Sequence, residues 1–506
     1  MSNNTTIAKN TMFLYFRMFL TMGVGLYTSR LILDALGVVD YGIYGLVGGI
    51  VTMFAFLNSA MSSATQRYLS FDIGKNDMER LQKTFNATLN IHFLVAIIIL
   101  ILSETIGLWF VNYKLDIPPD RMNAANWVYQ FSIFTFILNV IQVPYNALLI
   151  AREHMNIYAY VSILETLLKL FIALYLVQAN NDRLILYAIL IFSISFIIRM
   201  VYKVYCKKKF KESVYKFYFD KNYYKELMSY SGWNLFGNIA VVARSQGSNI
   251  LLNLFFGPVA NASYTLTVMV QGIISTFVSN FQVAVKPQII KNYSKGNYEA
   301  SLNLMYKSAK FSFFAMFILT LPFLFNIDFV MNFWLKEIPI YAISFIKLAL
   351  IYSLIETISN PMVTGAQATG KIKIYQIVVG SFIFLTLPTV WLVFKLTNDP
   401  LNMYYVLIGN SIIALIIRIG FLIKMMNLNI YTFIKDVIFK ILFVVLLAVC
   451  ASFLVNLLIN FNNDVINFFV KISLITMLNI LIISTVGLTL SERKFVLTFV
   501  KSKVKI

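Results

Sequence analysis

Residues 438–460 read IFKILFVVLLAVCASFLVNLLIN, in which Lys440 is the one charged residue. A helix that crosses the hydrocarbon core of a bilayer needs about 20 consecutive apolar residues. The rest of the chain contains about thirteen further segments of this kind, and only 13% of its 506 residues are charged while 59% are hydrophobic. The sequence therefore predicts an all-α polytopic membrane protein with about 14 transmembrane helices.

The predicted spans fill most of the chain and leave no stretch long enough for an independent soluble domain. They lie at residues 11–33, 41–64, 85–111, 126–150, 157–179, 184–206, 232–256, 260–285, 309–333, 340–365, 374–395, 401–423, 438–460 and 465–490.

The net charge of +20 is concentrated in alternate gaps between the predicted spans. Lys and Arg in the N-terminal segment and the even-numbered gaps outnumber those in the odd-numbered gaps several-fold, which by the positive-inside rule predicts that both termini are cytoplasmic. The basic charge therefore indicates membrane topology, and we expect no nucleic-acid partner. With only two cysteines and two histidines, we also expect no metal site and no cofactor.

Matching sequences lie on either side of a basic linker. LGVVDYGIYGL around Gly37 matches FGPVANASYTL around Gly257, and VPYNALLIAREHMNIYAYV (143–161) matches NPMVTGAQATGKIKIYQIV (360–378). The offsets, 220 and 217 residues, are nearly constant. A repeat of this kind predicts two lobes that rock about a central site. The predicted division is an N-lobe of six spans at 1–206, a basic cytoplasmic linker at 207–231, a C-lobe of six spans at 232–423, and two more spans with a basic cytoplasmic tail at 424–506.

Charged residues occur inside the spans, where burial in hydrocarbon is costly and usually kept for a function. Seven are basic and three are acidic: Arg17, Arg30, Lys169, Arg199, Arg244, Lys347 and Arg418 against Glu104, Glu165 and Glu356. Arg199 and Arg418 lie close enough to the inner face to snorkel to the headgroups. The remaining positive excess favours an anionic substrate, because Arg grips phosphate through paired donors.

The seventh span, SGWNLFGNIAVVARSQGSNILLNLFFG (231–257), has the strongest polar stripe. Asn234, Asn238 and Asn249 recur at helical spacing beside Arg244. Lipid cannot satisfy such side chains, so the stripe either lines a watery cavity or packs against another helix. The eighth span carries a second stripe that begins at Gln271.

The first and fifth spans supply the other candidates. Arg17 and Arg30 either bind substrate or snorkel, and Asp34 lies at the outer end of the first span. Glu165 and Lys169 are four residues apart, which allows an ion pair on one helix face. That pair either neutralises itself, or it opens when an anionic substrate competes for Lys169 and releases Glu165. The carboxylates of Asp34 and Glu165 are the candidates for Na⁺ or H⁺ coupling.

Three stretches resemble the polysaccharide-transporter branch of the MOP flippase superfamily, which includes the Wzx-type O-antigen flippases. They are SRLILDALGVVDYGIYGLV (29–47), ATQRYLSFDIG (64–74) and VPYNALLIAREHMNIYAYVSILE (143–165). The resemblance implies a two-lobed transporter that opens alternately to the two sides of the bacterial inner membrane. Its implied substrate is an undecaprenyl-pyrophosphate-linked oligosaccharide, such as an O-antigen (lipopolysaccharide), capsule or exopolysaccharide unit, held by a cationic cavity. The lipid II flippases of the same superfamily carry an arginine on the eighth span, where this chain has Lys286 at the inner end.

Within that resemblance we expect Arg244 and Arg30 to bind the pyrophosphate with help from Lys169 and Arg17. The asparagines and Gln271 would contact sugar hydroxyls, and membrane lipids, a glycan polymerase or glycosyltransferases are the expected partners. The alternative is an ion-coupled multidrug exporter of the same fold. We do not expect an enzyme, because the outer loops are short and hold few charged groups.

Overall fold

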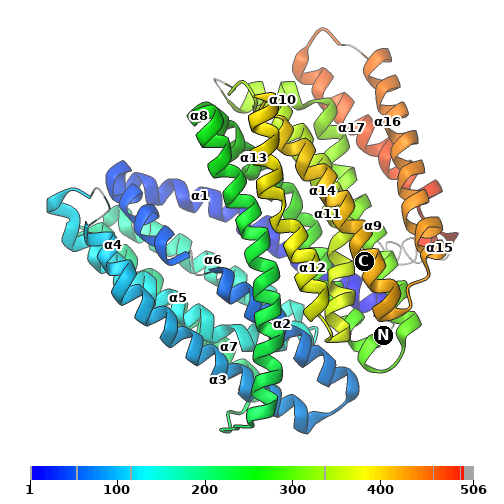
Figure 1. Ribbon diagram of the computed structural model, residues 1–506. Helices are drawn as coiled ribbons and strands as arrows, with labels where there is room; N and C mark the ends of the chain where they lie inside the picture. Colours follow the sequence, from blue (N-terminus) through cyan, green and yellow to red (C-terminus); the bar gives the residue numbers. More distant parts are fainter. Residues whose placement is uncertain are drawn as a thin grey trace, which may run out of the picture. The chain divides into compact units, whose positions relative to one another are not determined.

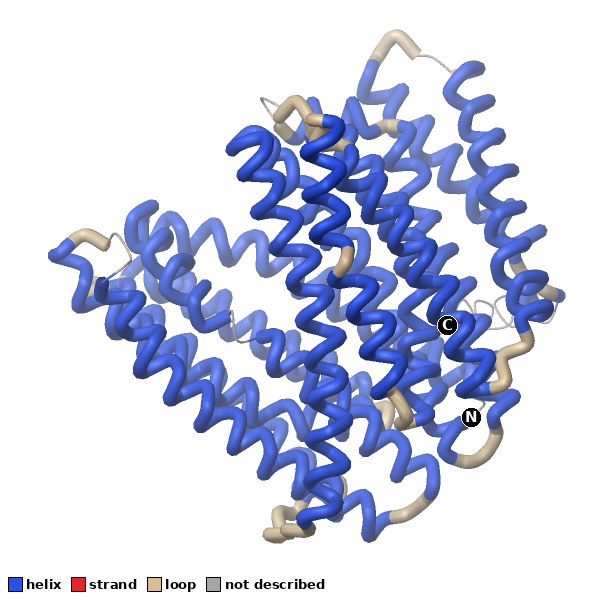
Figure 2. The backbone as a smooth tube through the Cα atoms, viewed as in Figure 1, coloured by secondary structure: helices blue, strands red, loops and turns tan. Residues whose placement is uncertain are grey.

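The computed structural model describes residues 3–52, 55–113, 115, 117–335, 338–459, 461–490 and 492–494. Helices and short connections make up this part of the chain, which contains no strand (Figure 2). The α-helices, labelled as in Figure 1, are α1 (Asn3–Thr52), α2 (Ala55–Lys75), α3 (Met78–Leu102), α4 (Leu108–Tyr113), α5 (Met122–Ala151), α6 (Met155–Gln178), α7 (Arg183–Lys209), α8 (Lys221–Ser294), α9 (Tyr298–Phe325), α10 (Ile327–Trp334), α11 (Ala342–Thr369), α12 (Lys373–Phe384), α13 (Thr386–Thr397), α14 (Asn402–Met426), α15 (Ile430–Phe433), α16 (Lys440–Leu458) and α17 (Asp464–Ile482). Short 3₁₀ and π segments join or interrupt them at Ser103–Gly107, Pro119–Arg121, Lys211–Ser213, Ile434–Phe439 and Ile483–Gly487.

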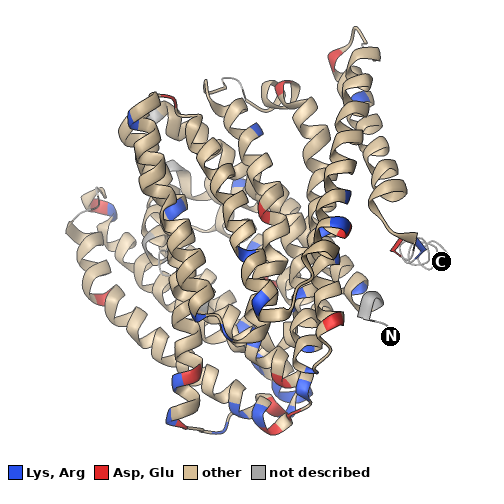
Figure 3. Cartoon of the chain, turned by 45° about the vertical axis from the view of Figure 1, so that its right-hand side comes forward, with Lys and Arg blue, Asp and Glu red and all other residues tan. Residues whose placement is uncertain are grey.

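Twelve of the described helices are long and apolar enough to cross a membrane. They correspond to twelve of the fourteen predicted spans, so the predicted count is approximate. The span predicted at 41–64 includes residues outside the described part, and the one predicted at 232–256 is helical but carries the polar stripe. Charged residues are sparse along most of the helix lengths (Figure 3), as a bilayer requires. The chain is a multi-pass membrane protein.

The chain divides into two compact units. The N-terminal unit is Thr6–Asn238, and the C-terminal unit is Ile239–Ile506 together with Met1–Thr5. The division falls inside α8, whereas the sequence places the start of the second lobe at 232. The reason is that α8 runs without a break from the linker through the polar stripe to Gly257.

The same backbone breaks recur in the two halves. Gly37 has φ 75° and ψ 168°, and Gly257 has φ 71° and ψ −167°, a region of backbone space that is essentially restricted to glycine. Two more left-handed turns match at the predicted offsets: Asn76 with Gly296, and Glu153 with Gly370. Asp77 and Asn297, one residue after the first of these turns, cap α3 and α9 through their side chains. The repeated sequences therefore form repeated structures.

Helix packing is also repeated within each unit. In the N-terminal unit α5 packs against α7, α3 and α2, and in the C-terminal unit α11 packs against α14 and α9. Both central helices contain an internal proline, Pro144 in α5 and Pro361 in α11. The central helix of each unit is thus strongly enclosed, and in the C-terminal unit α9 shows the same share of buried residues as α11.

The two helices that follow the second repeat dock on its α9. Both α16 and α17 contact α9, and Asn479 Nδ2 donates a hydrogen bond to the Phe317 carbonyl at 3.2 Å. Beyond α17, the Glu492 carboxylate accepts a hydrogen bond from Lys310 Nζ at 2.7 Å, with both side chains almost fully buried. This ion pair fixes the end of the predicted fourteenth span to the C-terminal unit. The predicted basic tail beyond residue 494 lies outside the described residues.

The linker forms a strap, residues 210–220, on the N-terminal unit. Glu212 accepts a hydrogen bond from Arg152 Nε at 2.8 Å, and the Lys216 N–H donates to Asn86 Oδ1 at 2.9 Å. The lysines of the linker lie on its outer side, since Lys207, Lys208, Lys209, Lys211, Lys216, Lys221 and Lys225 are all exposed. The linker is therefore held by specific contacts and presents its positive charge outward.

A buried carboxylate lies next to the strap. Asp72 accepts a hydrogen bond from Thr84, is paired with Arg80 Nε at 3.4 Å, and has a fully buried side chain. Thr84 also contacts the Tyr223 hydroxyl at the beginning of α8. Burial raises the pKa of Asp72 to about 6, and the Thr84 hydrogen bond and the charge of Arg80 oppose that rise.

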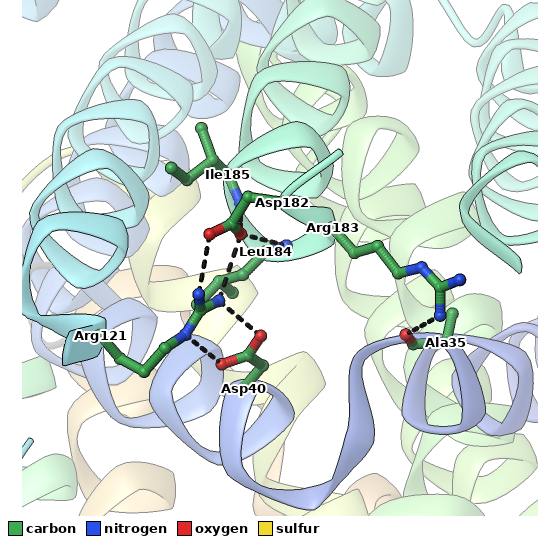
Figure 4. A network of polar contacts seen from close by, with 7 residues as sticks. All are labelled: Ala35, Asp40, Arg121, Asp182, Arg183, Leu184 and Ile185. Carbon is green, nitrogen blue, oxygen red and sulfur yellow. Dashed lines mark hydrogen bonds and ion pairs between the residues drawn. The ribbon is translucent and has the colours of Figure 1, made fainter. Parts of the chain in front are cut away.

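An ion network closes the opposite end of the N-terminal unit (Figure 4). Arg121 donates to Asp40 Oδ1 at 2.8 Å and to Asp182 Oδ2 at 2.8 Å, and Asp182 also caps α7. Arg183 Nη1 donates to the Ala35 carbonyl at 3.0 Å, just before the Gly37 break. The hydrogen bond from Arg121 lowers the pKa of Asp182. One arginine thus joins α1, just after its Gly37 break, to the beginnings of α5 and α7.

Candidate functional site

The C-terminal unit contains a cavity of about 370 Å³ between α8, α11 and α14. Its lining is mostly polar or aromatic: Val241, Arg244, Ser245, Ser248, Tyr264, Val268, Gln271, Ser275, Val278, Ser279, Gln282, Tyr352, Ser353, Glu356, Thr357, Asn360, Tyr404 and Leu407. Ordinary ligand pockets measure about 300–1,000 Å³. Arg244, Ser245 and Ser248 of the seventh predicted span therefore meet the polar stripe of the eighth at one cavity.

Arg244 is held in the cavity wall by an aromatic ring. Its guanidinium carbon lies 5.3 Å from the centre of the Tyr352 ring, a cation–π distance, and its side chain is half-buried. Beside it, Gln271 Nε2 donates to Ser353 Oγ at 2.6 Å. Both Arg244 and Gln271 are predicted site residues, and the structure brings them to the same cavity.

Glu356 and Arg418 add two charges around Tyr352. Tyr352 lies within electrostatic range of Arg244, Glu356 and Arg418 together. Arg418 is only 5% exposed and lies beside Tyr375, so the predicted snorkelling of Arg418 is wrong. The reason is that its helix face points into the unit, where tyrosine rings and a carboxylate stabilise the charge.

Several of these buried polar atoms have no hydrogen-bond partner among the described residues. They are Glu356 Oε1 and the Nε and Nη1 atoms of Arg418. Unsatisfied buried polar groups are rare and call for a ligand, an ion or a water molecule. The cavity lining has one arginine and one glutamate, and Arg418 is buried nearby beside Tyr375, so the region has polar atoms that no described residue satisfies.

A stripe on α11 completes the lining, and the sequence-based site prediction did not include it. Ser353, Glu356, Thr357 and Asn360 all line the cavity. Their spacing of three and four residues places them on one helix face. That periodicity is visible in the sequence, and reading it together with Glu356 would have identified the stripe.

The predicted asparagines do not share one environment. Asn249 accepts a hydrogen bond from Asn261 Nδ2 at 3.2 Å and does not line the cavity. Asn234 is buried, and its amide donates to the Tyr230 carbonyl at 3.3 Å on its own helix. Asn238 is half-buried at the end of the N-terminal unit. Their sugar-binding roles stay predictions.

A second polar cluster lies in the N-terminal unit. The Arg17 guanidinium lies 4.9 Å from the Tyr158 ring centre, and Tyr202 is within electrostatic range of Arg17, Tyr158 and Glu165. Lys169 Nζ donates to Glu165 Oε1 at 2.6 Å, so these two residues form an ion pair. The structure therefore places three of the predicted site residues, Arg17, Glu165 and Lys169, around one pair of tyrosines.

Arg30 and Asp34 lie apart from this cluster. Both side chains are exposed on α1, and no hydrogen bond or ion pair joins either of them to another described residue. Lys347 on α11 is exposed as well. These exposed side chains are accessible to a ligand, but no polar contact with another described residue fixes their orientation.

The N-terminal unit has a cavity of its own, but it lacks charge. It measures about 400 Å³ and lies between α1, α5 and α7. It is lined by Tyr44, Gly45, Gly48, Gly49, Val51, Phe131, Ser132, Thr135, Phe136, Asn139, Ala188 and Ile191. Electrostatics therefore distinguish the cavities of the two units.

The family to which the chain belongs is shown by its sequence. Residues 7–292 match the model of the family described as polysaccharide biosynthesis protein. A comparison with curated protein sequences found no match.

Solved structures show the fold. The chain is similar to a MATE transporter in complex with MaD3S, with a TM-score of 0.71, 12% identity, and coverage of 83% of this chain and 95% of that one. It is also similar to an outward-facing multidrug resistance MATE transporter of the MOP superfamily, with a TM-score of 0.68, 12% identity, and coverage of 82% and 94%. A MOP superfamily transporter from Pyrococcus furiosus gives a TM-score of 0.65, 12% identity, and coverage of 82% and 95%. At these identities the likeness concerns the fold, which is that of the MATE transporters. The chain belongs to the polysaccharide biosynthesis protein family.

Proposed function

We propose that the protein is a flippase that moves an undecaprenyl-pyrophosphate-linked oligosaccharide from the cytoplasmic to the periplasmic leaflet of a bacterial inner membrane. The glycan would be an O-antigen, capsule or exopolysaccharide unit, and transport would proceed by alternating access with both termini in the cytoplasm. The observation that carries the proposal is a cavity lined by Arg244 and by neutral hydrogen-bonding side chains, in a member of a polysaccharide biosynthesis family.

In this proposal Arg244 is the principal contact of the pyrophosphate. A guanidinium presents several N–H donors in a planar fork that matches phosphate oxygens, and Tyr352 holds it in place. Arg418 adds positive charge from behind the cavity wall, and Gln271 and the α11 stripe offer hydrogen bonds to sugar hydroxyls. Arg30, Arg17 and Lys169 are the contacts proposed for the N-terminal unit, with Asn234, Asn238 and Asn249 as further sugar contacts.

Coupling to Na⁺ or H⁺ and the protein partners belong to the same proposal. Asp34 and Glu165 are the predicted coupling carboxylates, and the Lys169 ion pair would have to open for Glu165 to act. The exposed linker lysines are suited to anionic headgroups at the cytoplasmic surface. A glycan polymerase or glycosyltransferases would deliver the substrate or take up the product.

The test is transport of a fluorescent undecaprenyl-pyrophosphate oligosaccharide in proteoliposomes. Arg244→Gln should slow flipping about 10–100-fold, because hydrogen bonds to a charged group contribute about 1.5–3 kcal/mol. Arg244→Lys is the matched control, since it keeps the positive charge and loses the planar fork of donors. Its flipping rate should lie between those of wild type and Arg244→Gln. Wild-type rates in Arg244→Gln would remove this residue from the site.

A multidrug exporter is the second candidate, favoured by a specific observation. Glu356 is an acidic group at the cavity with an unpartnered oxygen, as a cation site would need, and similar folds include a multidrug resistance MATE transporter. This candidate predicts gradient-driven export of an organic cation that Glu356→Gln abolishes. No flipping of any lipid-linked glycan, together with such export, would decide for the exporter.

A further inference from the structure

The two repeats differ at the end that the sequence predicts to be cytoplasmic. In the first repeat, the space between the beginning of α3 and the end of α7 is filled by the strap. Tyr215 OH donates to Asn90 Oδ1 at 3.0 Å, and the segment Lys211–Ser213 packs against α3. The linker thus supplies the side chains that cover this part of the N-terminal unit.

The corresponding space in the second repeat is open. Between the beginning of α9 and the turn from α14 to α15 lies a cavity of about 490 Å³. Its lining is Tyr293, Tyr298, Glu299, Leu302, Asn303, Tyr306, Met425, Met426, Asn427, Asn429 and Thr432. It belongs wholly to the C-terminal unit and is distinct from the cavity that contains Arg244.

Aromatic rings form one part of this cavity. The Tyr293 and Tyr298 ring centres are 4.9 Å apart, and Tyr298 is half exposed. Tyr306 is buried, and its hydroxyl reaches the Asn429 carbonyl at 3.5 Å. An aromatic face is apolar and accepts the C–H face of a sugar ring, while the tyrosine hydroxyls keep a polar edge.

Neutral hydrogen-bonding groups form the other part. The side-chain amides of Asn303 and Asn427 make no hydrogen bond to another described residue, so their donors and acceptors are free. Glu299 adds an exposed acceptor, and no lysine or arginine lines the cavity. An amide can both donate to and accept from a hydroxyl group, whereas a phosphate would require cationic donors.

We propose that this tyrosine–asparagine cavity binds one or two uncharged sugar residues of the glycan while the substrate is in the cytoplasmic leaflet. The assignment rests on the proposed flippase function. Under this proposal the C-terminal unit has two binding sites. The cavity around Tyr298 and Asn303 binds sugar at the cytoplasmic end, and the cavity that contains Arg244 binds pyrophosphate. The cavity volume, within the usual range for ligand pockets, accommodates a unit of that size.

The first experiment measures binding without transport. The probe is the oligosaccharide repeat unit released from the source cell's own surface polysaccharide, added to the full-length protein in nanodiscs and followed by saturation-transfer NMR. Wild type should bind saturably, and Tyr298→Ala and Asn303→Ala should each weaken binding at least tenfold. Both side chains are exposed, so neither variant should fail to fold.

Two controls sharpen this measurement. Tyr298→Phe keeps the ring and should retain most of the binding, and Tyr431→Ala removes a tyrosine that is 70% exposed and lies outside the lining. Tyr431→Ala should bind like wild type. The proposal is overturned if wild type binds no repeat unit saturably, or if the cavity variants bind as tightly as Tyr431→Ala.

The second experiment separates this proposal from the proposed function. Flipping of the glycosylated lipid is compared with flipping of bare undecaprenyl pyrophosphate. Asn303→Ala should lose the preference for the glycosylated lipid, whereas Arg244→Gln should slow both substrates. Equal slowing of both by Asn303→Ala would overturn sugar recognition at the cavity. If wild type flips neither lipid, the flippase proposal fails, while the binding result still decides whether the cavity takes sugar.

Discussion

The two units share a repeated sequence and repeated backbone breaks, yet they use the matching positions differently. In the N-terminal unit an ion network joins α1, just after its Gly37 break, to the beginnings of α5 and α7, and the strap covers the opposite end. In the C-terminal unit, Tyr341 occupies the position that matches Arg121 and stacks on Phe345, and two cavities contain polar side-chain atoms that make no hydrogen bond to a described residue. The difference teaches that repeated helices fix a scaffold, while individual side chains and connecting segments decide which polar groups are paired and which stay available to a ligand.

Breaking the Lys310–Glu492 pair should have the largest effect. Lys310→Met leaves the buried Glu492 carboxylate without its partner, which should lower the free energy of unfolding by about 3–5 kcal/mol. The measurement is chemical unfolding in micelles followed by tryptophan fluorescence. Arg152→Gln breaks the Arg152–Glu212 ion pair of the N-terminal unit and should cost less, because the Arg152 side chain is 22% exposed.

The double variant Lys310→Met with Glu492→Leu is the control for that prediction. It removes both charges, so much of the lost stability should return. A single Lys310→Met variant as stable as wild type would show that the last predicted span is held by apolar contacts alone.

Replacing Asp72 by asparagine should stabilise the N-terminal unit, and the gain should depend on pH. The C-terminal unit has Asn292 at the matching position, 220 residues later. Burial raises the pKa of Asp72 to about 6 from the ordinary 3.8, so the folded state binds the proton more tightly. The penalty of the buried charge is absent below about pH 4, grows between pH 4 and 6, and is complete above pH 6.

Asp72→Asn should therefore raise the unfolding free energy at pH 8 by on the order of 2–3 kcal/mol, with the gain vanishing near pH 4. Melting in nanodiscs between pH 4 and 8 measures this. Glu79→Gln, which changes an exposed carboxylate nearby, should show no such dependence. A wild-type melting temperature that stays level from pH 4 to 8 would contradict the prediction.

The glycine breaks should be equally sensitive in both repeats. Gly37→Ala and Gly257→Ala should each cost about 1–3 kcal/mol, because their φ and ψ values suit only glycine. An added Cβ meets nothing within 4 Å at either site among the described residues, so the cost is that of the backbone alone. Gly23→Ala, at a helical glycine with similar space, should be neutral or stabilising. If Gly37→Ala and Gly257→Ala lowered the free energy of unfolding by clearly different amounts, the two backbone breaks would not be structurally equivalent.

The smallest effect concerns the Arg121 network, whose counterpart 220 residues later is Tyr341. Arg121→Gln should cost about 1 kcal/mol, since the network is partly exposed and screened by salt. Arg121 lowers the pKa of Asp182, so this stability is present above the ordinary pKa of 3.8 and is lost as the pH falls further. Thermal melting at pH 7 and pH 3.5 should show a smaller difference between wild type and variant at the lower pH. Arg121→Lys, which keeps the positive charge, should retain part of the stabilisation. The prediction would be wrong if Arg121→Gln melted at the same temperature as wild type at pH 7 in low salt.

Much of the fold could be predicted from sequence because the bilayer imposes a simple rule on the chain. Apolar runs of span length gave the helices, and the spacing between Gly37 and Gly257 gave the repeat with its backbone breaks. The site was harder to predict. The polar stripes on their helices predicted Arg244 and Gln271 as site residues, but the sequence does not show that Glu356 lines the same cavity or that Arg418 is buried.

Periodicity in the sequence tells which residues share a helix face, but it does not tell which face meets which neighbour. The buried position of Arg418 among tyrosines and the pairing of Asn249 with Asn261 depend on that packing. The open cavity around Tyr298 and Asn303 had no signal of its own, because its lining comes from segments more than a hundred residues apart.

The amino-acid sequence by itself determined that this is a helical membrane protein with an internal repeat, because length, apolarity and glycine conformation are local properties of the chain. Tertiary structure alone decided which charges are paired, which are buried and which line a cavity. Those outcomes depend on contacts between distant helices, where a charge is stabilised only by the partners that packing brings to it.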